Sequence, residues 1–443
     1  MRGFPPGHRL RLQPARRRWE HSLSFSETAG FRLHSPNPAI LSPAVNSQPS
    51  NQRSHLTASL AALAIASVGI GAGLLWCCGL EERYIHALAP EFTEEKLQGA
   101  ALQKEAFSQP DLLVFYGSSE LVKEMPNNAT QFFADYPTGF RVFPVGKPGT
   151  ASLSVLQKVA AVGGDIRGRK VAYSISPGWF FSEVFDPTYY EGNFSQFQAL
   201  ELAFSDDLSA GLKRDVARRM LAYPKTVDDS WLLRFTLERL AGDTALDRAL
   251  YAAICPLGET AQFVGRTQDH FETALHILDE DEKLNPTPKR GLRALNWNEV
   301  LKRAAQFANH TAVQAKQNEV TRRKTAKSRA KTFLHALANA QEWTDIELLL
   351  RTFEELGARP LLLTMPVEDI RLEVYGLAPS ARTALLDRLD DLADRYHFPL
   401  RDFRDHQDER TFTVDFEDHL SGEGWLYYNK ALDDFYHGRI TSL

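Results

Sequence analysis

Residues 56–80 form an uncharged, apolar run, LTASLAALAIASVGIGAGLLWCCGL, and this run constrains the chain more than any other feature. About 20 apolar helical residues cross the hydrocarbon core of a bilayer, which is roughly 30 Å thick. Gly69, Gly71 and Gly73 would weaken a helix in water, but a membrane helix tolerates them. Trp76 suits an interface with lipid head groups. We therefore predict a transmembrane helix over residues 56–80; the alternative, a buried soluble helix, seldom runs this long without a charge.

The charges that flank this run indicate its orientation. Glu81 and Glu82 follow it directly, and a cleaved signal peptide is disfavoured because no small-residue cleavage site precedes them. Positive charge marks the cytoplasmic side of a membrane helix. We therefore predict a single-pass protein of the plasma membrane, with a cytoplasmic N-terminus and a large extracytoplasmic domain. The arginines before the run are Arg2, Arg9, Arg11, Arg16, Arg17, Arg18, Arg32 and Arg53.

The overall composition argues against several classes of protein. The formal net charge is only -5, so nucleic acid is a poor candidate partner. Cys77, Cys78 and Cys255 form neither a disulfide framework nor a zinc-binding spacing. The sequence has no phosphate-binding loop and no dinucleotide fingerprint after a strand. We therefore expect no metal and no cofactor.

The sequence divides into four parts. Residues 1–54 are rich in Pro, Ser, Asn and Arg, which predicts a disordered cytoplasmic segment before the membrane helix. Residues 81–109 read as a helical stalk. Residues 110–443 read as one large domain, in which helical patterns at about 190–340 form an insertion.

The large domain alternates apolar runs with amphipathic patterns. Apolar runs bounded by glycine or proline predict buried strands, and helical patterns lie between them. Strands that alternate with helices indicate an α/β domain built on a parallel sheet with helices on both faces. The predicted strands are 111–117, 141–146, 170–177 and 360–366, and two of the predicted helices are 152–162 and 343–356.

A serine follows the first predicted strand in the sequence Gly117-Ser-Ser119-Glu-Leu121. A serine on such a strand-to-helix turn exposes its hydroxyl at the carboxyl edge of the sheet, where free helix N–H groups can stabilise an oxyanion. The same sequence is also typical of a helix N-cap made by Ser118 or Ser119. The turn alone does not decide between these two interpretations.

A second group of candidate residues lies near the C-terminus. A serine nucleophile needs a base, and the base needs a carboxylate to orient it. His419 is preceded by Asp415 and Asp418 and followed by a glycine-rich helix start. Both aspartates are candidates for the orienting carboxylate. A rival pair, Asp402 and His406, lacks that helix start.

Four motifs, taken in chain order, resemble those of the DltD family of D-alanyl transfer proteins, a serine acyl-transfer member of the SGNH-hydrolase group. The resemblance covers roughly residues 56–440 and implies the flavodoxin-like, three-layer SGNH-hydrolase fold. Gly178 stands where the family usually has glutamine. The motifs are FYGSSEL at 115–121, GKPG at 146–149, SPGWF at 176–180 and HLSGEGW at 419–425.

The resemblance implies a role for each candidate residue. Ser119 is the nucleophile, His419 the general base, and Asp415 its orienter. Asp415 is preferred to Asp418 because Phe412-Thr-Val-Asp415 resembles the family's lead-in. An adjacent Asp418 would also struggle to turn onto the next imidazole. The oxyanion and substrate site is formed by Gly117, Gly146, Gly149 and Trp179, with the N–H groups of Ser119 and of Gly146 or Gly149 donating to the oxyanion.

The resemblance also implies a function. We expect extracytoplasmic D-alanyl transfer onto a cell-envelope polymer such as lipoteichoic acid. The partners implied are a membrane O-acyltransferase, an acyl-carrier protein and the envelope glycopolymer. An acyl esterase or thioesterase with the same triad, or a non-catalytic membrane scaffold subunit, remains an alternative.

Overall fold

The protein is described by a computed structural model that covers residues 52–280, 284, 295–324, 330–416 and 418–440. The chain forms two compact units, Met1–Leu63 and Ala64–Leu443. Nearly all of the N-terminal segment that we predicted to be disordered, residues 1–54, lies outside the described residues.

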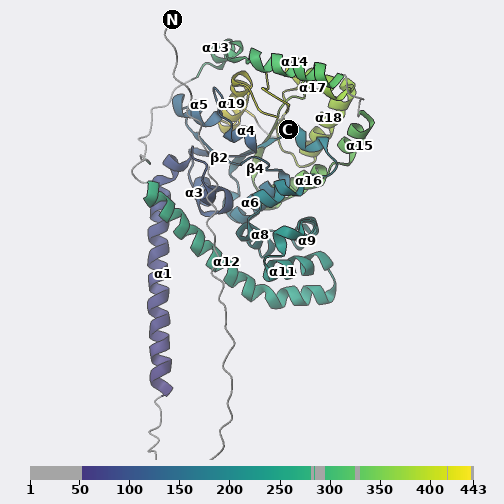
Figure 1. The fold of residues 1–443 in the computed structure, drawn as a ribbon. Helices are drawn as coiled ribbons and strands as arrows, with labels where there is room; N and C mark the ends of the chain where they lie inside the picture. Colours follow the sequence, from purple (N-terminus) through teal and green to yellow (C-terminus); the bar gives the residue numbers. More distant parts are fainter. Residues whose placement is uncertain (1–51, 281–283, 285–294, 325–329, 417, 441–443) are drawn as a thin grey trace, which may run out of the picture. The chain divides into compact units, whose positions relative to one another are not determined.

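A parallel sheet of five strands, in the order β2-β1-β3-β4-β5, forms the centre of the second unit (Figure 1). This order is that of flavodoxin-like folds, and it confirms the predicted α/β class. Four strands coincide with predicted runs, whereas the fifth has only two residues and was not predicted. The strands are β1 Leu112–Tyr116, β2 Arg141–Val145, β3 Lys170–Ile175, β4 Arg359–Thr364 and β5 Leu400–Arg401.

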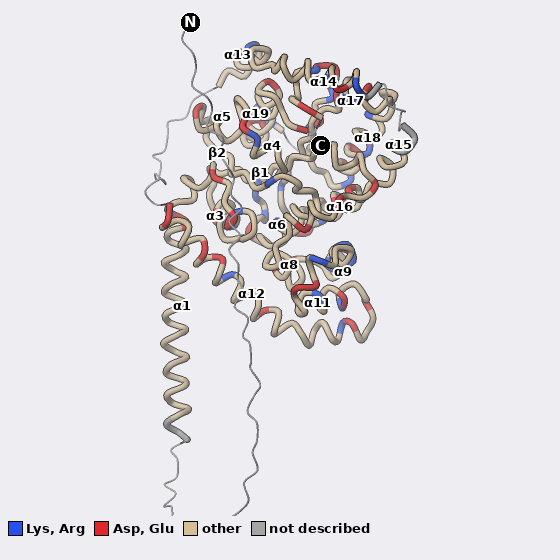
Figure 2. The backbone as a smooth tube through the Cα atoms, viewed as in Figure 1, with Lys and Arg blue, Asp and Glu red and all other residues tan. Residues whose placement is uncertain are grey.

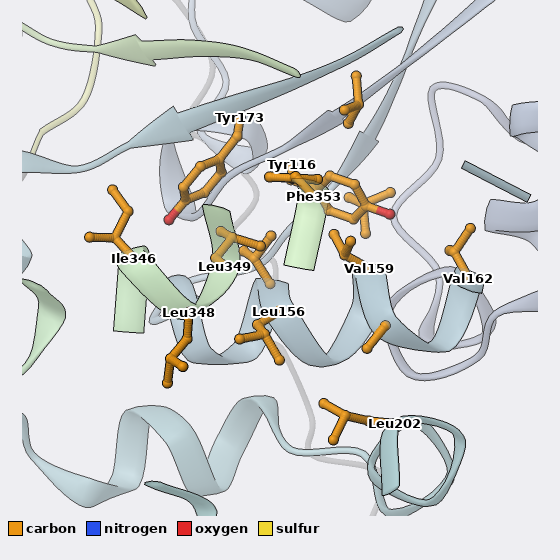
Figure 3. Packing of buried hydrophobic residues seen from close by; sticks show 14 of the residues in the cluster. Tyr116, Leu156, Val159, Val162, Tyr173, Leu202, Ile346, Leu348, Leu349 and Phe353 are labelled. Carbon is orange, nitrogen blue, oxygen red and sulfur yellow. The ribbon is translucent and has the colours of Figure 1, made fainter. Parts of the chain in front are cut away.

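Helices cover both faces of the sheet, because successive strand residues point to opposite sides and both sides are apolar. In β1, Val114 and Tyr116 belong to one core cluster and Phe115 belongs to the other. Figure 3 shows the first cluster, in which Tyr116 and Tyr173 of the sheet face Leu156 and Val159 of α6 and Leu349 and Phe353 of α16. The helices are α6 Ser152–Val162 and α16 Glu342–Leu356 on that face, and α5 Ala129–Asp135 and α19 Gly422–Tyr436 on the other.

Helix α1, Gln52–Leu88, contains the predicted membrane segment. Its stretch His55–Leu88 is long and apolar enough to cross a membrane, and only 6% of its most apolar part is buried. Between Ser54 and Leu80, α1 has no Asp, Glu, Lys or Arg, and on its coloured part Figure 2 shows charged residues only at the C-terminal end.

The segment that we expected to be a stalk, 81–109, consists of the end of α1 followed by α2, Glu94–Gln98, and α3, Ala101–Ser108. It does not stand clear of the domain. Leu102 and Phe107 are buried in the same cluster as the strands, because the apolar faces of these short helices pack against the sheet domain.

The described residues between β3 and β4 are mostly helical, as the sequence indicated for 190–340. Helix α16 then returns the chain to the sheet, and α17 and α18 lie between β4 and β5. The helices of this part are α7 Pro187–Asn193, α8 Gln196–Ala203, α9 Ala210–Met220, α10 Pro224–Val227, α11 Trp231–Gly242, α12 Ala245–Glu280, α13 Trp297–Leu301, α14 His310–Lys324, α15 Ala330–Asn339, α17 Asp369–Tyr375 and α18 Pro379–Arg395.

A buried lysine ties α6 to the start of the domain. The Lys158 ammonium is fully buried and donates a 2.8 Å hydrogen bond to the carbonyl of Leu97. Burial disfavours the charged form and lowers the pKa of Lys158 from its usual 10.5 to about 7. Between about pH 7 and pH 10.5, the unfolded chain therefore binds more protons at this lysine than the folded chain does. The free energy of unfolding consequently rises with pH over that range.

We predict that Lys158→Met removes this pH dependence. The free energy of unfolding of the unaltered protein should rise by a few kcal/mol, in order of magnitude, from pH 7 to pH 10 relative to that of the variant. Chemical unfolding in detergent at several pH values measures the difference. Lys225→Met is the control, because the Lys225 side chain is 76% exposed. If the free energy of unfolding changed with pH in the same way in the Lys158→Met variant and in the unaltered protein, the prediction would be contradicted.

Candidate active site

The Gly117-Ser-Ser119 turn connects β1 to a short helix, α4, Ser119–Val122. Ser118 occupies the N-cap position, but its side chain makes no capping hydrogen bond. The backbone N–H of Ser118 instead donates to the buried carboxylate of Glu120 at 2.9 Å. Burial raises the pKa of Glu120. The turn therefore leaves the hydroxyl of Ser119 available for another partner.

That partner is His419. Its Nε2 lies 2.9 Å from the hydroxyl oxygen of Ser119, and its Nδ1 lies 2.9 and 3.0 Å from the two carboxylate oxygens of Asp415. A serine, an imidazole and a carboxylate linked in this order can generate a nucleophilic alkoxide. The structure thus brings together three residues that are separated by up to 300 positions in the chain.

A local hairpin explains how Asp415 reaches His419 across four residues. Thr413 and Leu420 form an antiparallel bridge, and the N–H of Val414 donates to the carbonyl of His419 at 2.9 Å. Ser421 then caps α19 by accepting from the N–H of Gly424 at 3.1 Å. This loop holds the aspartate and histidine side by side at the start of α19.

Lys123 is a site residue that the sequence reasoning missed. Its ammonium donates to the Asp415 carboxylate at 2.6 Å and lies 3.2 Å from Nδ1 of His419. Burial alone would raise the pKa of Asp415, but hydrogen bonds and charge from His419 and Lys123 hold that pKa well below its usual range. Asp415 therefore stays ionised. Lys123 lies four residues after Ser119, about one helical turn along the chain, and this spacing was the available signal.

Asp418, the other predicted carboxylate, lies elsewhere. Its buried side chain accepts from the Ser176 hydroxyl at 2.6 Å and from the N–H of Gly178 at 2.5 Å, and it pairs with the guanidinium of Arg371. A Cβ at Gly178 would lie 2.6 Å from the Asp418 carboxylate, so the close approach requires glycine there. Through these bonds, Asp418 connects the loop between Thr413 and Leu420, which we call the histidine loop, to the end of β3.

The predicted oxyanion glycines lie at the ends of β1 and β2. The N–H of Gly117 donates to the carbonyl of Val145 at 3.2 Å, and a Cβ on Gly146 would lie 2.1 Å from the carbonyl oxygen of Gly117. Within the described residues, the N–H groups of Ser119 and Gly146 have no acceptor. Both are therefore available to a ligand.

The other two predicted residues lie beside Tyr189. Gly149 has φ +85, and a Cβ there would lie 2.8 Å from the ring of Tyr189. Trp179 packs edge-to-face against Phe185 and Tyr189, with ring centroids 5.2 and 5.3 Å apart.

The rival pair of the sequence, Asp402 and His406, is bonded differently. Asp402 pairs with Arg404 at 2.5 Å, and His406 bonds Glu409 at 2.8 Å. Neither bond joins the pair to a serine nucleophile.

Among the described residues, the structure has one group with the ligand types of a metal site. Cys78, Glu81 and His270 place ligand atoms within 4.8 Å of one another on α1 and α12. Nδ1 of His270 already bonds the Glu81 carboxylate at 2.8 Å, so the contact is satisfied as an ion pair between two helices.

We predict that Arg371→Met lowers the free energy of unfolding by about 3–5 kcal/mol, because it leaves the buried Asp418 carboxylate without its cation. Adding Asp418→Asn to that variant should restore much of the loss, since the amide oxygen still accepts from Ser176 and Gly178. Denaturant unfolding of the single and double variants measures both effects. A loss below about 1 kcal/mol in the single variant would show that the pair is not needed.

The sequence of this chain matches the model of a known protein family. The DltD family, described as DltD protein, matches residues 89–437. The relatives include Protein DltD of Bacillus subtilis, 26% identical over 83% of this chain and 93% of the relative. Protein DltD of Staphylococcus aureus is 20% identical over 81% of this chain and 89% of the relative. Because the match extends from the end of α1 to the end of α19, it includes every residue of the candidate site, and the chain belongs to the DltD family.

Proposed function

We propose that this protein is an extracytoplasmic serine acyltransferase that moves D-alanyl groups onto a cell-envelope polymer such as lipoteichoic acid. DltD proteins take part in the D-alanylation of teichoic acids. The observation that carries the proposal is the hydrogen-bonded chain from the hydroxyl of Ser119 through His419 to Asp415.

The first half of the reaction forms an acyl-serine. His419 Nε2 takes the hydroxyl proton of Ser119 as the serine oxygen attacks the D-alanyl carbonyl of an ester or thioester. The negative charge that develops on the carbonyl oxygen accepts hydrogen bonds from the N–H groups of Ser119 and of Gly146 or Gly149. The bond to the leaving alcohol or thiol then breaks, and the imidazolium returns the proton to that leaving group.

The second half transfers the acyl group. A hydroxyl of the polymer enters, gives its proton to His419 and attacks the acyl-serine carbonyl. Collapse of this second intermediate regenerates Ser119, which recovers the proton from the imidazolium. Asp415, held ionised by Lys123, keeps Nδ1 protonated and directed toward it in both halves. The bonds broken and formed balance without a cofactor or an oxidant.

The proposed reaction requires a membrane orientation for this protein and partners that supply and accept the acyl group. Helix α1 crosses the plasma membrane with the N-terminus in the cytoplasm, and the sheet domain lies outside. A membrane O-acyltransferase and an acyl-carrier protein supply the activated D-alanyl group, and the envelope glycopolymer accepts it. An esterase or thioesterase would use the same residues with water as the acceptor, whereas a scaffold subunit would have no need of the serine–histidine bond.

We predict that a fluorophosphonate probe labels Ser119 in the purified full-length protein. Ser119→Ala and His419→Ala should each abolish labelling, because one removes the nucleophile and the other its base. Ser118→Ala is the matched control, since this neighbouring hydroxyl does not contact His419, and it should label like the unaltered protein. Labelling that persists in folded Ser119→Ala protein would place the nucleophile elsewhere.

Asp415→Asn should slow labelling by about two to four orders of magnitude while leaving the fold intact, because the amide no longer stabilises the imidazolium. Asp418→Asn should label at a rate within a few-fold of the unaltered protein, since Asp418 contacts Ser176 and Gly178 rather than the imidazole. Labelling rates with circular dichroism as the fold check test both variants. The reverse order of effects would make Asp418 the orienting residue.

A further inference from the structure

Helix α12 is the longest helix after α1, and one of its faces is fixed to the domain. Gly258 lies against the ring of Phe204, and Ile277 is fully buried. The carboxylate of Asp269 accepts from the N–H groups of Ala100 and Ala101, each at 2.8 Å. These contacts set the rotation of α12 about its own axis, so its opposite face has a defined direction.

That opposite face is apolar and exposed. Leu257, Val264 and Leu275 are 43%, 57% and 65% exposed, and at 3.6 residues per turn they fall within about 20° of one another. We call these three residues the α12 stripe. Between Arg248 and Arg266 the helix has a single charged side chain, Glu259, which projects about 160° away from Leu257. No element of the described chain covers the stripe.

The α12 stripe continues onto the membrane helix. Phe271 lies two turns after Val264 on the same side of α12, and its ring would lie 2.7 Å from a Cβ on Gly73 of α1. One residue earlier, His270 bonds Glu81 of α1 at 2.8 Å. Figure 1 shows α12 meeting α1 and running from there past α8 and α11. The face of α12 that contacts the uncharged part of α1 through Phe271 is therefore the same face on which the α12 stripe is exposed to solvent.

We propose that the α12 stripe rests on the lipid bilayer from which α1 emerges, as an interfacial helix. Lipid is the occupant that the contacts favour, because the stripe is continuous with a helix that itself faces lipid. Helices of this kind bury an apolar face at the boundary between head groups and acyl chains and keep charged residues along their flanks. A row of exposed apolar side chains along one helix face is a candidate interaction surface. A second attachment beside α1 fixes the tilt of the sheet domain against the membrane, independently of the serine chemistry.

The test uses the full-length chain in nanodiscs of phosphatidylcholine and phosphatidylglycerol. In a background with Cys77, Cys78 and Cys255 replaced by alanine, Leu257→Cys or Val264→Cys carries an environment-sensitive NBD label. Glu259→Cys is the matched control, because this exposed position lies two residues from Leu257 but projects from nearly the opposite side of the helix. Lipids with doxyl groups in their acyl chains should quench the labels at 257 and 264 several-fold more than the label at 259, and aqueous iodide should give the reverse order.

Three results would overturn the proposal. One is that the labels at 257 and 264 are quenched by iodide as strongly as the label at 259. Another is that they are shielded from both quenchers, which would mean that a second copy of the chain covers the stripe. A parallel measurement needs no substitution: a phospholipid with a diazirine in its acyl chain should cross-link to α12 peptides of the unaltered protein, whereas adducts confined to α1 would be the third contrary result.

Discussion

The candidate site depends on one geometric constraint, which is that the carboxyl ends of parallel strands meet at a single edge of the sheet. The turn after β1 carries Ser119, the turn after β2 carries Gly146, and the turn after β3 carries Gly178. None of these turns is near His419 in the chain. The Asp418 carboxylate links the loop that carries His419 to the turn after β3, and His419 in turn bonds Ser119 after β1.

The two aspartates near His419 illustrate how burial separates groups that look alike in sequence. Asp415 is partly exposed and faces the imidazole and the Lys123 ammonium, so it stays ionised and can orient a base. Asp418 is buried with Arg371 and acts within the architecture of the loop. One carboxylate thus serves the proposed chemistry and the other holds that chemistry in place. The buried position of Asp418 also explains the glycine at 178, because a side chain there would collide with the Asp418 carboxylate.

Much of the fold could be predicted from the sequence, because strong local patterns coincide with whole elements. The helix at 152–162 has the predicted bounds, and the four long strands agree within a residue or two. β5 was missed because its two residues carry no periodic pattern. The segment 81–109 was read as a stalk because its short helices reveal their burial only in contact with the sheet. For the site, the motifs singled out Ser119, His419 and Asp415. Lys123 had only its spacing of four residues from Ser119 as a signal, and Arg371 enters through a tertiary contact that no local pattern encodes.

In the proposed reaction, Ser119 carries the acyl group between donor and acceptor. The most direct measurement is mass spectrometry of the full-length protein after brief incubation with a D-alanyl thioester, with rapid acid quenching to preserve an ester. A D-alanyl adduct is expected on the peptide that contains Ser119, present in the unaltered protein and absent from His419→Ala. Transfer to a polymer without any adduct on that peptide, or an adduct that forms equally well in His419→Ala, would contradict it.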